Sequence, residues 1–83
     1  MRFQVIVKPT AEKAIESVPK EYRARTMRAI DALATDPYLG KPLHGKRAGQ
    51  FSYRIGPYRI IYRIEKNLLI VFVIDFGGRG GVY

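Results

Sequence analysis

The chain has 83 residues, 47% of them hydrophobic, and it contains no cysteine. This length predicts one domain, residues 1–83, with a single modest core, and the lack of cysteine excludes disulfide frameworks and thiolate zinc sites. Fifteen Lys and Arg against seven Asp and Glu give a net charge of +8, which favours a polyanionic partner: nucleic acid first, then an acidic protein or an anionic membrane surface.

The first eight residues show the alternation of a half-buried strand, with one apolar face made by Phe3, Val5 and Val7. Pro9 and Thr10 end this strand. Thr10 is the expected N-cap of a helix, because its hydroxyl can accept a hydrogen bond from a free amide of the first turn. The apolar residues of this helix recur at helical spacing: Ala11, Ala14, Ile15 and Val18.

A second helix is expected after Pro19, which suits the first turn of a helix and disfavours helix at the residue before it. Its buried stripe consists of Tyr22, Thr26, Ala29, Ile30 and Leu33. Asp36-Pro37 ends it, because the residue before a proline is disfavoured in helical conformation. The two helices therefore form a helical hairpin.

The second half of the chain begins with a Gly/Pro-rich loop over residues 38–50 and continues with three predicted strands. The strands cover about residues 50–55, 57–65 and 68–76, with tight links at Gly56-Pro57 and Lys66-Asn67. Such strands form an antiparallel meander, which the first strand extends to a small mixed sheet. The fold class is α+β, in the order β-α-α-β-β-β, with the helices on one face. The glycine-rich end from residue 77 is expected to be irregular.

Two classes of targeting segment are not found in the sequence. The N-terminus lacks the apolar stretch of a signal peptide, and no apolar run approaches the length of a membrane span. We expect a cytoplasmic protein without a membrane partner.

The positive charge is concentrated in the second half. Residues 1–40 carry seven basic and five acidic side chains, a net of +2, whereas residues 41–83 carry eight and two, a net of +6. Tyr58 and Tyr62 share a face with apolar residues of their strand, so they are interpreted as core aromatics.

Three arginines of the second half are expected on one surface. Side chains alternate along strands, so Arg54, Arg59 and Arg63 lie on the sheet face that the helices leave open. The only carboxylates of this half, Glu65 and Asp75, cannot neutralise them all. Arginine on an exposed face also serves solubility, and Arg63 could pair with either acid. For Arg54 and Arg59, on adjoining strands, we favour an anionic ligand.

These residues, in their order, resemble the RelE/ParE toxin superfamily of type II toxin–antitoxin systems. The resemblance rests on "PTAEKAIESVPKE", the "DP" stop, "PLHG", "FSYRIGPYRIIYRI" and the ending Gly-Arg-x-x-Val-Tyr. It covers nearly the whole chain and implies the fold described above. It also implies a RelE-like mRNA interferase: a ribosome-dependent endoribonuclease that needs no metal or other cofactor, inhibits translation, and is held inactive in a hetero-oligomer with a cognate acidic antitoxin.

The resemblance implies roles for individual residues. The candidate catalytic residues are Arg54, Arg59, Arg79 and Tyr83; Arg59 would clamp the phosphate, Arg79 would stabilise the transition state or protonate the leaving group, and Tyr83 would orient the target base or help in proton transfer. The candidate RNA-binding residues are Lys46, Arg47, Ser52 and Arg63.

Two positions depart from the pattern of the family. Ser52 stands where the best-known ribosome-dependent members carry a lysine, and Gly78 stands where many relatives carry a histidine. His44, in the "PLHG" loop, is the one histidine of the sequence, and it is interpreted as a surface residue. Two alternatives therefore stay open: a ParE-like poison of DNA gyrase, and a catalytically impaired homologue that acts by binding.

Overall fold

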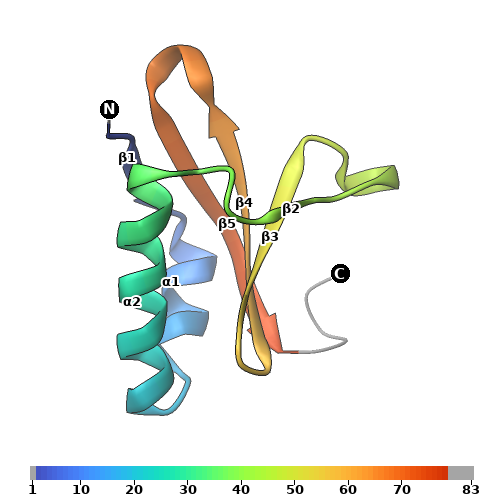
Figure 1. Ribbon diagram of the computed structural model, residues 1–83. Helices are drawn as coiled ribbons and strands as arrows, with labels where there is room; N and C mark the ends of the chain where they lie inside the picture. The colour runs from blue at the N-terminus through green and yellow to red at the C-terminus, as the bar shows by residue number, and fades with distance from the viewer. Residues whose placement is uncertain (1, 79–83) are drawn as a thin grey trace.

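The computed structural model describes residues 2–78, and it confirms the predicted α+β class. Helices α1 (Pro9–Glu16) and α2 (Lys20–Thr35) cover one face of a five-stranded sheet (Figure 1). The strands, in sheet order, are β1 (Gln4–Val7), β5 (Ile70–Gly78), β4 (Tyr58–Glu65), β3 (Gln50–Ile55) and β2 (Lys41–Pro42). Short 3-10 turns, η1 (Gly45–Arg47) and η2 (Lys66–Leu68), follow β2 and β4.

The sheet is mixed, as predicted. β1 runs parallel to β5, and the other neighbouring pairs are antiparallel. β5, the partner of β1, is the last strand of the meander, so the helical hairpin and the strands β2, β3 and β4 separate the two in the sequence. A hydrogen bond from the Phe3 N–H to the Ala34 carbonyl, 2.7 Å long, ties the start of the chain to the end of α2.

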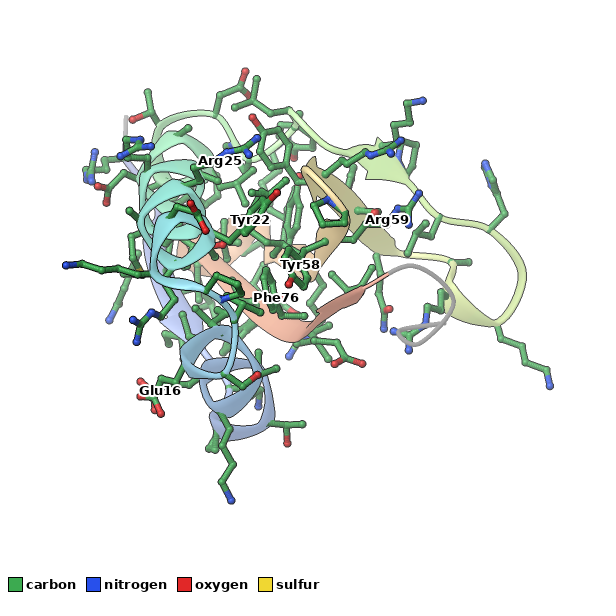
Figure 2. All side chains as sticks on the ribbon, turned by 90° about the horizontal axis from the view of Figure 1, so that it is seen from below. Glu16, Tyr22, Arg25, Tyr58, Arg59 and Phe76 are labelled. Carbon is green, nitrogen blue, oxygen red and sulfur yellow. The ribbon has the colours of Figure 1, made fainter. Side chains whose placement is uncertain are left out.

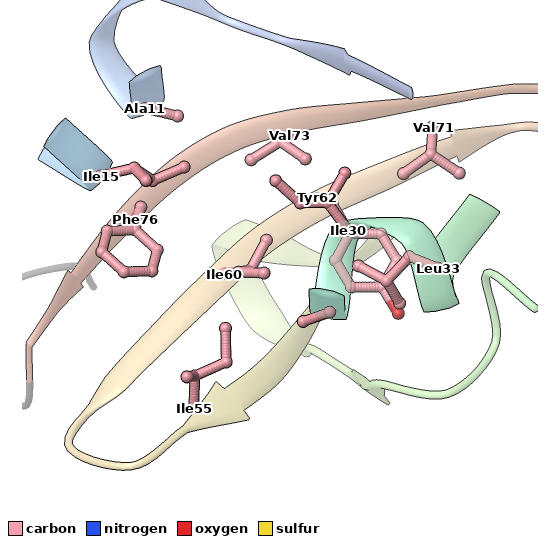
Figure 3. Close-up of a cluster of buried hydrophobic side chains, with 11 residues drawn as sticks. Ala11, Ile15, Ile30, Leu33, Ile55, Ile60, Tyr62, Val71, Val73 and Phe76 are labelled. Carbon is pink, nitrogen blue, oxygen red and sulfur yellow. The ribbon is translucent and has the colours of Figure 1, made fainter. Parts of the chain in front are cut away.

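The core lies between the helices and one face of the sheet (Figure 3). Leu33 of α2 and Tyr62 of β4 are fully buried, as are Ile60, Val71 and Val73. The predicted stripes of both helices supply the other side of the core, with Ala11, Ile15, Ala29 and Ile30 all buried. Tyr58 and Tyr62 pack in or against this cluster, which confirms their interpretation as core aromatics.

A β-bulge in β5 changes which side chains reach the open face. Ile61 pairs with Asp75, but the next residue, Tyr62, pairs with Val73, so Ile74 is the extra residue. Strict alternation would put Asp75 on the same face as Val73, in the core. The bulge instead turns the Asp75 carboxylate to the open face, where it lies 3.8 Å from the Arg47 guanidinium.

Some sequence predictions were wrong in detail. Thr10 lies inside α1 and does not cap it, because Pro9 occupies the first helical turn and extended Lys8 is the N-cap. Gly77 and Gly78 belong to β5, since pairing with Arg59 and Tyr58 overrides the weak strand propensity of glycine.

Two connections also differ from the prediction. The loop over residues 38–50 contains the two-residue strand β2 and the turn η1. The link from β4 to β5 uses η2 and Leu69, which has a positive φ of 54°, so it is longer than the expected turn at Lys66-Asn67.

Candidate nucleic-acid interface

Arg54 and Arg59 lie directly opposite each other on β3 and β4, on the face away from the helices. In Figure 2, Arg59 points to the side of the sheet opposite to that of Tyr58 and Phe76, which face the helices. The Leu43 N–H donates to the Gln50 carbonyl, so even-numbered residues of β3 direct their backbone groups toward β2. Arg54 and Arg59 are therefore a non-hydrogen-bonded pair, the kind in which facing side chains are closer.

The two guanidinium groups have few partners. The Nε of Arg54 donates to the Gly56 carbonyl at 3.1 Å. Arg59 is half-buried, and no hydrogen bond or ion pair to its guanidinium is found among residues 2–78. Like charges that face each other across two strands are destabilising. An anion bound between Arg54 and Arg59 would remove this repulsion.

A groove of about 470 Å³ lies beside this pair, and we call it the arginine groove. Its charged side chains are Lys41, Arg54 and Arg59, and no carboxylate contributes to its lining. Ser52 lies in the same groove, opposite Lys41 on β2. The remaining lining residues are Leu39, Gly40, Pro42, Leu43 and Tyr53. Three cations and a hydroxyl around an open groove form a suitable site for a phosphodiester.

Lys41 was missed in the sequence, although it lies beside the candidate residues. β2 has only two residues, so it carries no periodic pattern that could reveal it. Its position follows from the buried hydroxyl of Tyr62, which donates to the Pro37 carbonyl at 2.8 Å and accepts from the Gly40 N–H at 3.0 Å. These bonds fix the segment that leads into β2.

The environment of Tyr62 also changes its acidity. Burial raises the pKa of the phenol above its ordinary value of 10.0, and the nearby Asp36 carboxylate acts in the same direction, while the hydrogen bond from Gly40 acts against them. The phenol therefore stays neutral and keeps the proton that it donates to Pro37.

Arg47 and Arg63 both have acidic partners, unlike Arg59. Arg47 is 3.8 Å from the Asp75 carboxylate, and its Nη1 donates to the Gln50 side chain at 2.9 Å. Arg63 forms an ion pair with Glu65 and lies over the Phe72 ring, 4.4 Å from its centroid. The carboxylates already compensate part of the charge that these two arginines could offer to RNA.

The other candidate residues lie elsewhere or outside the described part of the chain. Lys46 lies with Arg47 and His44 around a second pocket of about 460 Å³, next to Leu43. Arg79 and Tyr83 lie outside residues 2–78, so their predicted roles stay predictions.

A family model described as the ParE toxin of type II toxin–antitoxin systems, parDE, matches residues 4–83. The chain is 32% identical to Toxin RelG of Mycobacterium tuberculosis over 85 aligned positions, which cover 100% of this chain and 98% of that protein. The chain belongs to the RelE/ParE toxin superfamily. Toxin RelE of the same organism is 29% identical, covering 98% of this chain and 86% of that protein.

Two solved structures of other proteins share this fold. The toxin–antitoxin complex RelBE2 from M. tuberculosis has a chain with a TM-score of 0.87 and 31% identity, covering 95% of this chain and all of that one. The archaeal RelE–RelB complex from Pyrococcus horikoshii gives a TM-score of 0.84 and 25% identity, covering 98% and 99%. The first was solved as a toxin–antitoxin complex and the second as a complex of RelE with RelB.

The described part of the toxin has two further properties. Among residues 2–78, no three His, Asp or Glu side chains gather in a way that could hold a metal ion. Neither of the helices in this part is long and apolar enough to cross a membrane.

Proposed function

We propose that this toxin is an mRNA endoribonuclease that cuts at the ribosome in the cytoplasm and is held inactive by a cognate acidic antitoxin. The observation that carries the proposal is the facing pair Arg54 and Arg59 in a groove whose lining has no carboxylate. The RelE relatives solved as complexes with RelB support the antitoxin partner. The net charge of +8 suits both an RNA and an acidic protein.

The proposed reaction is an internal transfer at one phosphodiester. The ribose 2′-oxygen attacks the adjacent phosphorus and loses its proton, the bond to the 5′-oxygen breaks, and that oxygen takes up a proton. The products are a cyclic phosphate and a 5′-hydroxyl end. Negative charge grows on the non-bridging oxygens in the transition state, and Arg59, Arg54 and Lys41, which line one groove, would stabilise it.

Proton transfer needs groups beyond the arginine groove. His44 lines the neighbouring pocket and not this groove, and arginine essentially does not deprotonate. We assign the proton transfers to the ribosome or to Tyr83, and stabilisation of the transition state to Arg79. Ser52, Lys46 and Arg47 would contact the RNA backbone on either side.

The test uses two substitutions in β4 that remove the same charge. Arg59→Gln should lower the cleavage rate of translated mRNA about 100- to 1,000-fold, as expected when one donor to the transition state is lost. Arg63→Gln should lower the cleavage rate much less, because the Arg63 guanidinium already forms an ion pair with Glu65. Cleavage is measured in a purified translation system by mapping 5′-hydroxyl ends. Equal cleavage by Arg59→Gln and the natural toxin would contradict the proposal.

A second candidate function is inhibition of DNA gyrase. The matching family model is that of ParE, and Gly78 offers no side chain where many relatives carry a histidine. This function predicts that Arg59→Gln still arrests growth, and that the natural toxin blocks supercoiling by purified gyrase while leaving mRNA intact.

A further inference from the structure

A second basic groove lies on the other side of β3, between this strand and α2. It has a volume of about 270 Å³, and we call it the edge groove. Arg25 and Arg28 of α2 line it together with Arg54. Its other lining residues are Ala29, Ala32, Tyr53 and Ile55, so no carboxylate contributes to it either.

Arg25 is held near the β3–β4 turn. Its guanidinium lies 5.3 Å from the centroid of the Tyr22 ring, in a cation–π contact. A Cβ added to Gly56 would lie 3.5 Å from the Arg25 Nη1, and the Gly56 carbonyl already accepts from Arg54. In Figure 2, Arg25 lies beside Tyr22 between α2 and the sheet. The turn thus brings a helix arginine and a strand arginine together.

Neither helix arginine is neutralised within the described residues. The ion pairs found there join Arg2 to Asp31, Arg47 to Asp75 and Arg63 to Glu65. None of them includes Arg25 or Arg28, and both side chains are exposed.

The two grooves meet at β3, where they share two lining residues. Tyr53 and Arg54 line both the arginine groove and the edge groove. β2 begins at Lys41, opposite Ser52, so no strand pairs with the backbone groups of Arg54, which point toward that edge. The Arg54 N–H is therefore a further donor for an anion. A free strand edge of one residue is too short to pair with the strand of an added peptide, but its N–H can donate to a phosphate.

We propose that the edge groove binds the phosphodiester backbone of the same RNA strand that occupies the arginine groove, through Arg25, Arg28 and the backbone N–H of Arg54. The site rests on the proposed function, because the strand must enter from the arginine groove. It extends the RNA contact from the open face, over the edge of β3, to α2. Substrates long enough to span both grooves gain affinity from it, and short ones do not.

The test compares two single-stranded RNAs of about four and about sixteen nucleotides, the range of typical single-strand site sizes. Both carry 2′-O-methyl riboses, so they cannot be cut. Binding is measured over a series of salt concentrations. The measured quantity is the slope with which the logarithm of the binding constant falls against the logarithm of the salt concentration. Arg25→Gln and Arg28→Gln should each make this slope shallower by about 0.7 for the long RNA, and the double variant by about 1.4. The reason is that fewer counterions are released from the RNA when a phosphate contact is lost. The slope for the short RNA should not change.

Arg23→Gln is the matched control. Arg23 lies on the same helix but lines the groove between α1 and α2, next to Glu12 and Glu16. Equal slopes for Arg23→Gln and Arg28→Gln would overturn the edge groove. So would a loss of antitoxin binding without any change in RNA binding, which would assign the groove to an acidic peptide. Arg25→Lys keeps the charge and should restore most of the slope even if the Tyr22 contact weakens.

The same measurements test the proposed function independently of the edge groove. If Arg59→Gln leaves the binding of both RNAs unchanged, the arginine groove is not an RNA site, whatever Arg25 and Arg28 do. If Arg59→Gln weakens both RNAs while Arg25→Gln and Arg28→Gln weaken neither, only the edge groove is wrong.

Discussion

The phenolic hydroxyl of Tyr62 joins the core to the segment that carries Lys41. It is fully buried and bonded to the Pro37 carbonyl and the Gly40 N–H. Tyr62→Phe keeps the ring, which stacks on Phe51 at 5.5 Å, but leaves two backbone groups without this partner. We expect a loss of about 1–3 kcal/mol in the free energy of unfolding, measured with urea. An unchanged stability would show that the segment relaxes and finds water.

The same residue predicts a dependence on pH. The folded state holds the pKa of Tyr62 above 10.0, so the unfolded chain loses this proton first as the pH rises. The stabilising contribution of the phenol is therefore complete below pH 10.0 and is lost as the pH rises through the raised pKa of the folded state. The difference in stability between the natural toxin and Tyr62→Phe should shrink above pH 10.0. If the difference in the free energy of unfolding in urea is the same below and above that pH, the pKa of Tyr62 is not raised in the folded state.

At the scale of single residues, alternation along strands was enough to place Arg54 and Arg59. Both belong to strands with a clear apolar face. Because that face packs in the core, the side chains of the other face, including these two arginines, point away from the helices. Lys41 could not be placed this way, because a hydrogen bond from a distant residue, Gly40 to Tyr62, positions its segment. Arg25 was also out of reach, since its role depends on a contact between a helix and a turn.

At the scale of elements, the β3–β4 turn sets the register that brings Arg54 opposite Arg59. Gly56 has a φ of +57°, and an added Cβ would lie 2.8 Å from the Tyr22 ring. Gly56→Ala should therefore cost about 1–2 kcal/mol from the backbone alone, and more from the displaced ring. Gly45→Ala is the control, because Gly45 has a φ of +66° and open space around it. Equal losses in urea unfolding would show that Tyr22 moves without cost.

The strands that could be predicted were those with a regular pattern, and β3 was found with the expected bounds, Gln50–Ile55. The bulge at Ile74 could not be predicted, since it follows from fitting Phe76 and Val73 into one core. It decides where Asp75 points, and so it allows Asp75 to pair with Arg47. The charge of the open sheet face thus depends on a β-bulge, which side-chain alternation in the sequence does not predict.

At the scale of the whole molecule, fold and family could be read from the order of weak motifs along the chain. What the sequence could not show is how the +8 charge is distributed in space. The structure gathers Lys41, Arg54 and Arg59 around one groove, and Arg25 and Arg28 around a second groove that shares Arg54. The cationic side chains of the free toxin therefore repel one another, and the polyanion proposed to bind them would stabilise the folded state.

This repulsion predicts opposite effects of salt on stability and on binding. Raising the ionic strength from about 0.01 to 0.15 M shortens the screening length from about 30 to 8 Å. The free toxin should then gain stability, with about 0.2–1 kcal/mol from the Arg54–Arg59 pair, while its affinity for RNA falls. Arg59→Gln should reduce the gain in stability. Arg2→Gln should not, because Arg2 faces the Asp31 carboxylate at 3.8 Å and salt weakens an attraction there. If Arg59→Gln and Arg2→Gln gain equally in thermal unfolding, the facing arginines do not repel each other in the free toxin.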